Sequence, residues 1–343
     1  MMNWDKLMEK AVLFSLFGIC LFITSAAWTE PELGIKGTHF TRDGEPVFLL
    51  GISYYGALGA PRESIQRDLD EMKTYGFNWI RVWAAWAAFD NDAAAVDPEG
   101  EARQPYLDNL RWLIEQCGQR GMMVDVTLSR GNGVTGPPRL QTPEAHRCAA
   151  RTLTQSLQSL RNWYLDMGNE RNIKDKRYIS LDELADVRKL VKSLDPRRLV
   201  TASWGGDMDK EELRRCLLDV QLDFITPHRP RGAGSAEETA KQTGIYFEWM
   251  TEVGRKVPVH YQEPFRRGYS SKSFDPQAAD FIMDLQGAIQ GGAAGWCFHN
   301  GDQRSRDDGQ PRRSFDMRKK RLFEQLDDVE IDFLKQLKSI KMN

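Results

Sequence analysis

The sequence predicts an α/β protein in which eight parallel strands, each followed by a helix, close into a (β/α)8 TIM barrel. Eight short apolar runs alternate with eight segments of helical periodicity along the 343-residue chain. The runs are apolar throughout, which is typical of parallel strands that are covered on both faces. No GxGxxG or P-loop pattern follows the first run, so the alternative, an open doubly wound sheet, has no motif in its favour.

Each predicted strand is a short apolar run that ends in polar or aromatic residues. The strands are expected at 48–55, 77–83, 122–128, the run that begins at 162, 199–204, 222–228, 257–262 and 293–298. Because the sites of such barrels lie at the C-terminal ends of the strands, the polar residues there should gather around one mouth.

The predicted helices follow from apolar residues at three- and four-residue spacing and from capping signals. Thr142 before Pro143 is a helix start, and Ser180 with Glu183 forms a capping box. The helices are expected at 61–75, 106–119, 142–161, 180–194, 210–218, 235–255, 276–290 and 322–340.

A β-hairpin is predicted at 37–48, with its turn at 42–45, and it should close the bottom of the barrel. The chain shows no internal repeat and no low-complexity linker, so residues 28–343 are expected to form a single catalytic domain.

Residues 1–27 read as a signal peptide. Lys6 and Lys10 precede the apolar run 11–24, and Ser25-Ala26-Ala27 is a small-x-small cleavage site. The run is short for a membrane span, so we expect export to the periplasm or the medium, with no stable span after cleavage.

The net charge and the motif content of the sequence do not point to nucleic acids, cofactors or metals as partners. A net charge of −2 gives no indication of nucleic-acid binding, and no motif indicates a cofactor or metal. Four cysteines of the mature chain permit two disulfides, and free buried thiols are equally compatible with the pattern: Cys117, Cys148, Cys216 and Cys297.

Two glutamates end opposite strands of the predicted barrel. Glu170 follows the fourth strand and Glu263 ends the seventh, so both should face the same cleft. Two carboxyl groups about 5–5.5 Å apart cleave a glycosidic bond with retention of configuration, and a wider spacing gives inversion. Arg81 can keep one of them ionised, and Asn169 offers an amide to a sugar hydroxyl. Further candidate substrate-binding residues at strand ends are Tyr54, Trp204, His228, Trp296 and His299, with Trp296 as a possible stacking platform.

The pattern resembles a known group. Gly168-Asn169-Glu170 after strand four, Glu263 ending strand seven, Arg81 in strand two and Trp296 ending strand eight are similar to the clan of retaining (β/α)8 glycosidases that includes glycoside hydrolase family 5, the cellulase and mannanase family. The resemblance covers nearly the whole mature chain. It implies a cofactor-free hydrolysis of an oligo- or polysaccharide, with Glu170 as acid/base and Glu263 as nucleophile.

The chain departs from that family at two strand ends. Ser129-Arg130 replaces the usual His after strand three, and His228-Arg229-Pro230 replaces His-x-Tyr after strand six. The missing Tyr normally orients the nucleophile. Whether Tyr261 reaches Glu263 is left open by the sequence.

Six arginines follow strands six to eight on the side of the expected site: Arg229, Arg231, Arg266, Arg267, Arg304 and Arg306. Because arginine suits bidentate recognition of carboxylate or sulfate, they suggest an anionic glycan. The alternative is that they pair with Asp302, Asp307 and Asp308 to order a loop. Two other functions also remain open, namely a transglycosylase with the same residues and a non-catalytic glycan-binding barrel.

Overall fold

A computed structural model of the chain describes residues 30–88, 91–128, 139–174, 177–268, 274–301 and 313–340. The expected signal peptide lies outside these residues, as do Ser129-Arg130, Arg304, Arg306 and the three aspartates proposed as their partners. Within the described part of the chain, no helix is long and apolar enough to cross a membrane.

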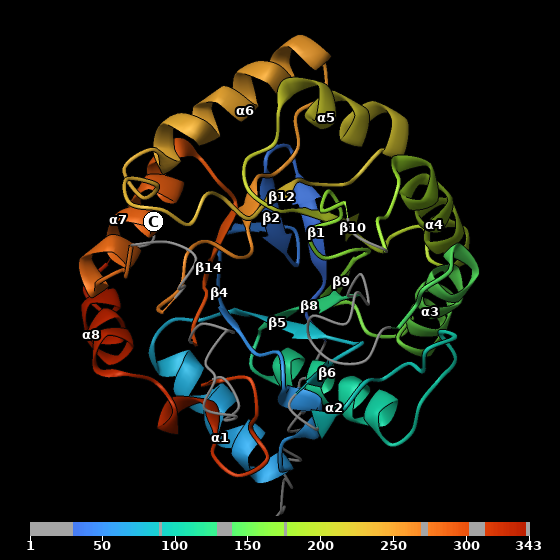
Figure 1. The fold of residues 1–343 in the computed structure, drawn as a ribbon, viewed down its shortest axis with the longest axis horizontal. Helices are drawn as coiled ribbons and strands as arrows, with labels where there is room; N and C mark the ends of the chain where they lie inside the picture. The colour runs from blue at the N-terminus through green and yellow to red at the C-terminus, as the bar shows by residue number, and fades with distance from the viewer. Residues whose placement is uncertain are drawn as a thin grey trace, which may run out of the picture.

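Eight parallel strand positions close into a barrel, as predicted (Figure 1). Seven strands pair in the order β10 (Val200–Thr201), β9 (Trp163–Asp166), β8 (Met123–Thr127), β5 (Trp79–Trp83), β4 (Leu49–Ser53), β14 (Gly295–Phe298) and β13 (His260–Tyr261). The predicted strand 199–204 continues past β10 as β11 (Ser203–Trp204), which pairs in parallel with β12 (Thr226–Pro227). A parallel bridge from Ile225 to Val259 then joins β12 to β13, and this completes the ring.

The helices surround this ring (Figure 1). They are α1 (Arg62–Thr74), α2 (Tyr106–Gln119), α3 (Pro143–Ser156), α4 (Leu181–Leu194), α5 (Lys210–Arg215), α6 (Thr239–Val253), α7 (Ala278–Gly291) and α8 (Asp328–Leu337). Thr142 and Ser180 accept the backbone N–H bonds expected of N-caps. The predicted last helix, 322–340, is wrong at its start. Asp327 and Glu330 form a capping box that begins α8 later, and only a 3₁₀ turn covers Leu322–Glu324.

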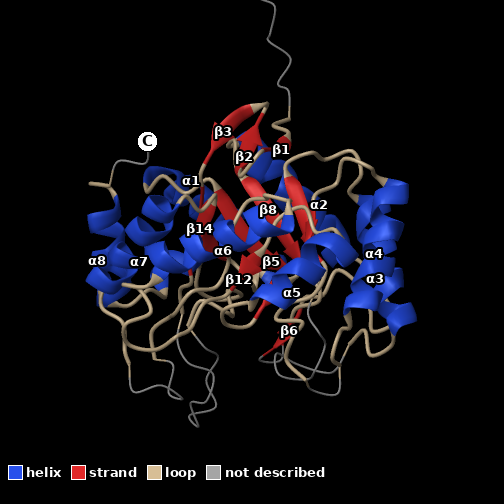
Figure 2. Ribbon diagram, turned by 90° about the horizontal axis from the view of Figure 1, so that it is seen from above, coloured by secondary structure: helices blue, strands red, loops and turns tan. Residues whose placement is uncertain are grey.

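A three-stranded antiparallel sheet closes the bottom of the barrel, at the opposite end from the loops that follow the barrel strands (Figure 2). It consists of β1 (Leu33–Lys36), β2 (His39–Arg42) and β3 (Glu45–Val47), so the predicted hairpin carries one more strand than expected. Phe40 of β2 packs edge-on against Phe224 and His260 inside the barrel.

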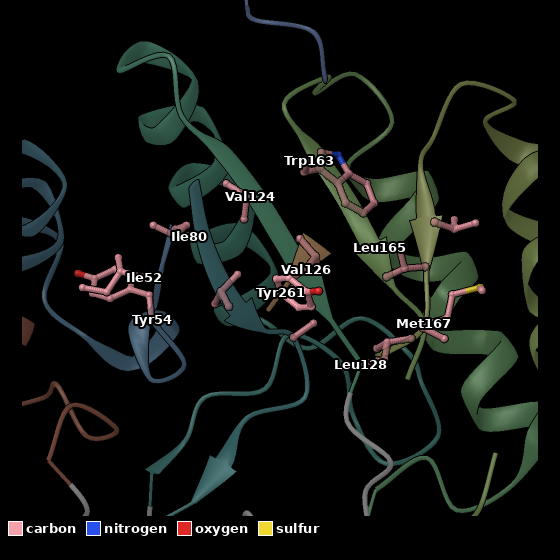
Figure 3. Packing of buried hydrophobic residues seen from close by; sticks show 14 of the residues in the cluster. Ile52, Tyr54, Ile80, Val124, Val126, Leu128, Trp163, Leu165, Met167 and Tyr261 are labelled. Atoms are coloured by element: carbon pink, nitrogen blue, oxygen red, sulfur yellow. The ribbon is translucent and has the colours of Figure 1, made fainter. Parts of the chain in front are cut away.

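The core has two shells because successive side chains of a strand point to opposite faces. The inner shell fills the barrel with residues such as Leu49, Trp79 and Tyr164. The outer shell, which includes Ile52, Ile80, Val124 and Leu165, packs between the strands and the helices (Figure 3). This alternation decides which strand-end side chains reach the mouth.

Cys117, Cys148, Cys216 and Cys297 are free thiols in the structure. Cys117, Cys216 and Cys297 are buried, and burial raises the pKa of each thiol above its usual range. None of these three is therefore a ready nucleophile.

Candidate active site

Glu170 lies in a loop that the neighbouring strands hold in place. The backbone N–H of Asn169 donates to the carbonyl of Leu128 at the end of β8, at 2.9 Å. The N–H of Glu170 donates to Ser203 Oγ in β11, at 3.0 Å. Glu170 itself has a left-handed backbone, with φ at 46°, which is uncommon for a glutamate and is typical of functional sites. The strand ends on both sides thus fix the direction of its carboxylate.

Glu263 follows β13 and is anchored through one oxygen. Its Oε1 accepts a hydrogen bond from Tyr55 OH at 2.6 Å and an ion pair from Arg81 Nη1. The pKa of Glu263 is well below its usual range because His228, Arg81 and Arg231 outweigh the effect of burial. Glu263 is therefore a carboxylate at neutral pH.

Arg81 links the two strand-end glutamates to the barrel interior. Its guanidinium is fully buried and contacts Asp125 at 3.1 Å and Asp166 at 2.9 Å. It also donates to Asn169 Oδ1 at 3.0 Å. A buried arginine needs such partners, because an unpaired charge in the interior is strongly unfavourable. The guanidinium of Arg81 thus contacts both Asn169, next to Glu170, and Glu263. It also supplies Glu263 with the positive charge that the sequence suggested for Arg81.

The two glutamates meet at Arg231 and His228. Arg231 Nη2 lies 3.1 Å from Glu170 Oε1 and 2.9 Å from Glu263 Oε2. His228 Nδ1 lies 3.2 Å and 3.5 Å from the same two oxygens. Burial alone would raise the pKa of Glu170, but Arg231 and His228 lower it to about 2. Both carboxylates are thus ionised in this state.

A directional chain of hydrogen bonds ends on Glu263. Arg266 Nη1 donates to His299 Nε2 at 3.0 Å, so the proton of this ring lies on Nδ1, which donates to Ser53 Oγ at 2.9 Å. Burial lowers the pKa of His299 well below its usual range, which agrees with a neutral ring. Ser53 in turn donates to Tyr55 OH at 3.3 Å, and Tyr55 donates to Glu263. His299 is thus linked to Glu263 through Ser53 and Tyr55, and its Nε2 lies 3.9 Å from Glu263 Oε2.

Known structures share this barrel. One glycoside hydrolase superposes with a TM-score of 0.67 at 16% identity, over 91% of this chain and 74% of that one. A glycoside hydrolase family 5 protein from Bacteroides vulgatus gives 0.65 at 18% identity, over 91% and 71%. The endo-1,4-β-mannanase from Rhizomucor miehei gives 0.60 at 11% identity, over 90% and 100%. This chain shares the (β/α)8 barrel fold of these glycoside hydrolases. Neither a family model nor a curated protein sequence matches the chain.

Three predicted substrate-binding residues lie away from the mouth of the barrel. Tyr54 is buried in the outer shell and donates to Asp68 at 2.8 Å. Trp296 is 0% exposed and donates to Asp284 of α7 at 2.7 Å, so its prediction as a stacking platform is corrected. Trp204 points outward from β11, next to the inward Ser203, and the Arg171 guanidinium lies 5.0 Å above its ring.

Strand alternation is the reason for these corrections. In β4 and β14 the inward residues are Ser53, Tyr55, Cys297 and His299, and the intervening side chains face the helices. Tyr55, not Tyr54, therefore reaches Glu263. Its ring packs against the rings of Trp83, Trp86 and Phe315.

A Trp296→Phe substitution separates the two roles considered for Trp296. We expect a loss of about 1–3 kcal/mol in the free energy of unfolding, from the lost bond to Asp284 and the smaller ring. Activity should stay within about threefold of the parent protein, because surface and outer-core changes leave the site intact. A tenfold or larger rise in KM without loss of stability would restore the sugar-platform role.

Tyr55 is the tyrosine whose hydroxyl contacts the carboxylate of Glu263. Tyr261 does not do so, because its hydroxyl lies against Thr243 Oγ1 of α6 at 2.6 Å. For Tyr55→Phe we expect kcat/KM to fall about 10- to 100-fold, the usual effect of removing a hydrogen bond to a charged group. Tyr261→Phe is the matched control and should retain activity, with any change confined to the unfolding midpoint. Equal losses of activity in both variants would contradict the assignment.

Glu170, His228 and Glu263 each offer one ligand atom, and these atoms lie within 4.8 Å of one another, a spacing that suits a metal ion. The guanidinium groups of Arg81 and Arg231 already contact the same carboxylates. A divalent cation would meet both positive charges at short range, so this donor set favours carboxylate chemistry over cation binding.

Proposed function

We propose that this protein is a retaining β-glycoside hydrolase that acts on an oligo- or polysaccharide by double displacement. The observation that carries the proposal is the close pair of strand-end carboxylates, which approach within 4.8 Å across the mouth of a family 5 barrel. This separation supports the retaining arrangement, because inverting enzymes leave about 6.5–9.5 Å for a water molecule between the two groups.

The contacts of Glu263 distinguish its two oxygens. Oε1 is anchored by Tyr55 and Arg81, whereas Oε2 faces Glu170 across Arg231. In the proposed first step Oε2 attacks the anomeric carbon, the glycosidic C–O bond breaks, and Glu170 gives its proton to the leaving oxygen. In the second step Glu170 takes a proton from water, the water oxygen attacks the anomeric carbon, and the bond to Glu263 breaks.

The substrates to be tested first are those of the enzymes that share the fold. Three of them are β-mannanases, from Rhizomucor miehei, blue mussel and Thermotoga petrophila, so β-mannan and β-1,4-linked glucans are the first substrates of the panel. Aryl β-glycosides and polysaccharides with uronate or sulfate groups complete it. We also propose that the chain is exported, on the basis of its first 27 residues.

The anomer released at early times tests the mechanism. Proton NMR of a hydrolysed β-glycoside should show the β-anomer first, followed by mutarotation. Initial release of the α-anomer would rule out double displacement, and no hydrolysis across the whole panel would favour the non-catalytic glycan-binding barrel.

A further inference from the structure

Arg231 occupies the space in which the proposed reaction takes place. Its Nη2 lies between the acid/base oxygen and the nucleophile oxygen, at 3.1 and 2.9 Å. The anomeric carbon must come within bonding distance of Glu263 Oε2, and the leaving oxygen must meet Glu170. Atoms of the sugar and of the guanidinium cannot share that position. Arg231 must therefore leave it before each turnover.

The loop that carries Arg231 is fixed at its ends and exposed between them. Arg229 is held by Asp207 at 2.6 and 2.7 Å, and its guanidinium also donates to the carbonyl of Ser235 at 3.0 Å. Between these anchors, Gly232 and Gly234 have no atom within 4 Å of the place where a Cβ would be. There is thus open space beside Gly232 and Gly234, whereas Arg229 joins the two ends of the loop to each other and to Asp207.

The charges indicate where the guanidinium goes. While Arg231 contacts Glu170, it contributes the largest part of the effect that lowers the pKa of this carboxyl to about 2. Glu170 therefore holds no proton to donate. When Arg231 moves away, the pKa of Glu170 rises, and the negative charge of Glu263 raises it further. An anion on the substrate can then replace Glu170 as the partner of Arg231. Because the substrate brings one negative charge and Glu170 gains one proton, the net charge of the site stays the same.

The neighbouring arginines do not compete for this role. Arg229 pairs with Asp207, and Arg267 pairs with Asp275 and Asp327 at 2.8 and 3.0 Å. Arg266 contacts His299 and lies over the ring of Phe315. Of the arginines the sequence suggested for anion recognition, Arg231 is the one, within the described residues, that contacts both glutamates.

We propose that Arg231 is a specificity-determining residue that moves from the two catalytic glutamates to a carboxylate or sulfate of the glycan, next to the scissile bond. This inference rests on the proposed glycosidase function and narrows its substrate class to acidic glycans. It makes activation depend on the substrate, because the group that binds the anion is the group whose departure allows Glu170 to be protonated.

Matched substrate pairs test the proposal. A uronate-containing oligosaccharide is compared with its carboxyl-reduced form, and a sulfated one with its desulfated form. The parent protein should prefer at least one acidic member by about 10- to 100-fold in kcat/KM, as expected for a charge-assisted bidentate contact. Preference in the first pair identifies a uronate and preference in the second a sulfate. No preference in either pair overturns the proposal.

The Arg231→Ala variant should lose that preference and should hydrolyse the neutral member at least as fast as the parent protein does. The basic limb of its pH profile on the neutral member should move to higher pH, because Arg231 no longer lowers the pKa of Glu170 and only His228 still does so. Arg267→Ala is the matched control and should keep both the preference and the profile. Equal losses by Arg231→Ala on both members of a pair, or an unmoved basic limb, would contradict the proposal.

Binding separates this inference from the proposed function. In the Glu263→Gln protein, isothermal titration with the preferred acidic oligosaccharide should give an affinity at least about tenfold higher than with its neutral partner, and the further Arg231→Ala change should abolish the difference. This result would support acidic recognition even if no substrate were turned over. Equal affinities would overturn it even if the protein proved to be a glycosidase.

Discussion

Glu263→Gln is expected to lower kcat/KM by about 10³-fold or more, since removal of a covalent nucleophile eliminates the step that forms the glycosyl intermediate. The amide has nearly the size of the carboxylate, and its carbonyl oxygen can still accept from Tyr55 and Arg81. The loss should therefore appear in the chemistry and not in the fold.

The unfolding midpoint distinguishes these two outcomes. Glu263 is one of three carboxylates around Arg81, so its neutralisation leaves the guanidinium paired with Asp125 and Asp166. The variant should melt within a few degrees of the parent protein. Glu183→Gln is the matched control, because Glu183 also contacts an arginine and a histidine, Arg177 and His146, and lies on α4. We expect this control to melt earlier and to keep its activity. The reverse pattern would place the essential carboxylate elsewhere.

Glu170→Ala is expected to show a loss that depends on the leaving group. With natural glycans, which need a proton on the leaving oxygen, kcat/KM should fall about 10²- to 10⁴-fold. With 2,4-dinitrophenyl glycosides, whose leaving group departs without protonation, the first step should be almost unaffected.

Azide gives the second half of this test. It can enter the space left by the carboxylate and attack the glycosyl intermediate, since it needs no general base. Added azide should therefore raise turnover of the dinitrophenyl substrate and yield a β-glycosyl azide. Glu170→Gln, which fills the space, should show the same leaving-group dependence without rescue. A uniform loss on all substrates with no azide product would remove Glu170 from the acid/base role.

The sequence predicts the barrel well because each strand and helix carries its own local signal. Apolar runs, N-caps such as Thr142 and Ser180, and the order of the elements are readable without tertiary contacts. The ends of elements are less readable. The helical spacing of apolar residues, for example, predicts a last helix from residue 322, but the capping box of Asp327 and Glu330 begins it later.

The candidate site is predictable where it depends on strand ends. Glu170, Glu263, Arg81 and Asn169 come together as expected. The prediction of Tyr54 as a substrate-binding residue is wrong. Every second residue after the inward Leu49 also faces inward, and this alternation leads to Tyr55, which contacts Glu263.

The same alternation of side chains places Trp296 and His299 on opposite faces of the sheet. Gly295 faces inward, where a Cβ would meet the ring of His260 at 2.3 Å, so Trp296 must face the helices. Arg231 follows no such rule. It lies in a loop, and the direction of its side chain depends on Arg229 and Asp207, which are close only in the folded protein.

The most direct test of the central claim is to trap the intermediate with a 2-deoxy-2-fluoro β-glycoside that carries an activated leaving group and to digest the protein with trypsin. Glu263 is the single carboxylic side chain of the expected peptide 257–266, whereas Glu170 falls in the peptide 162–171. The account predicts one fluorosugar mass on the first peptide, absent from Glu263→Gln. A label on peptide 162–171, or steady turnover of the reagent by the Glu263→Gln protein, would contradict it.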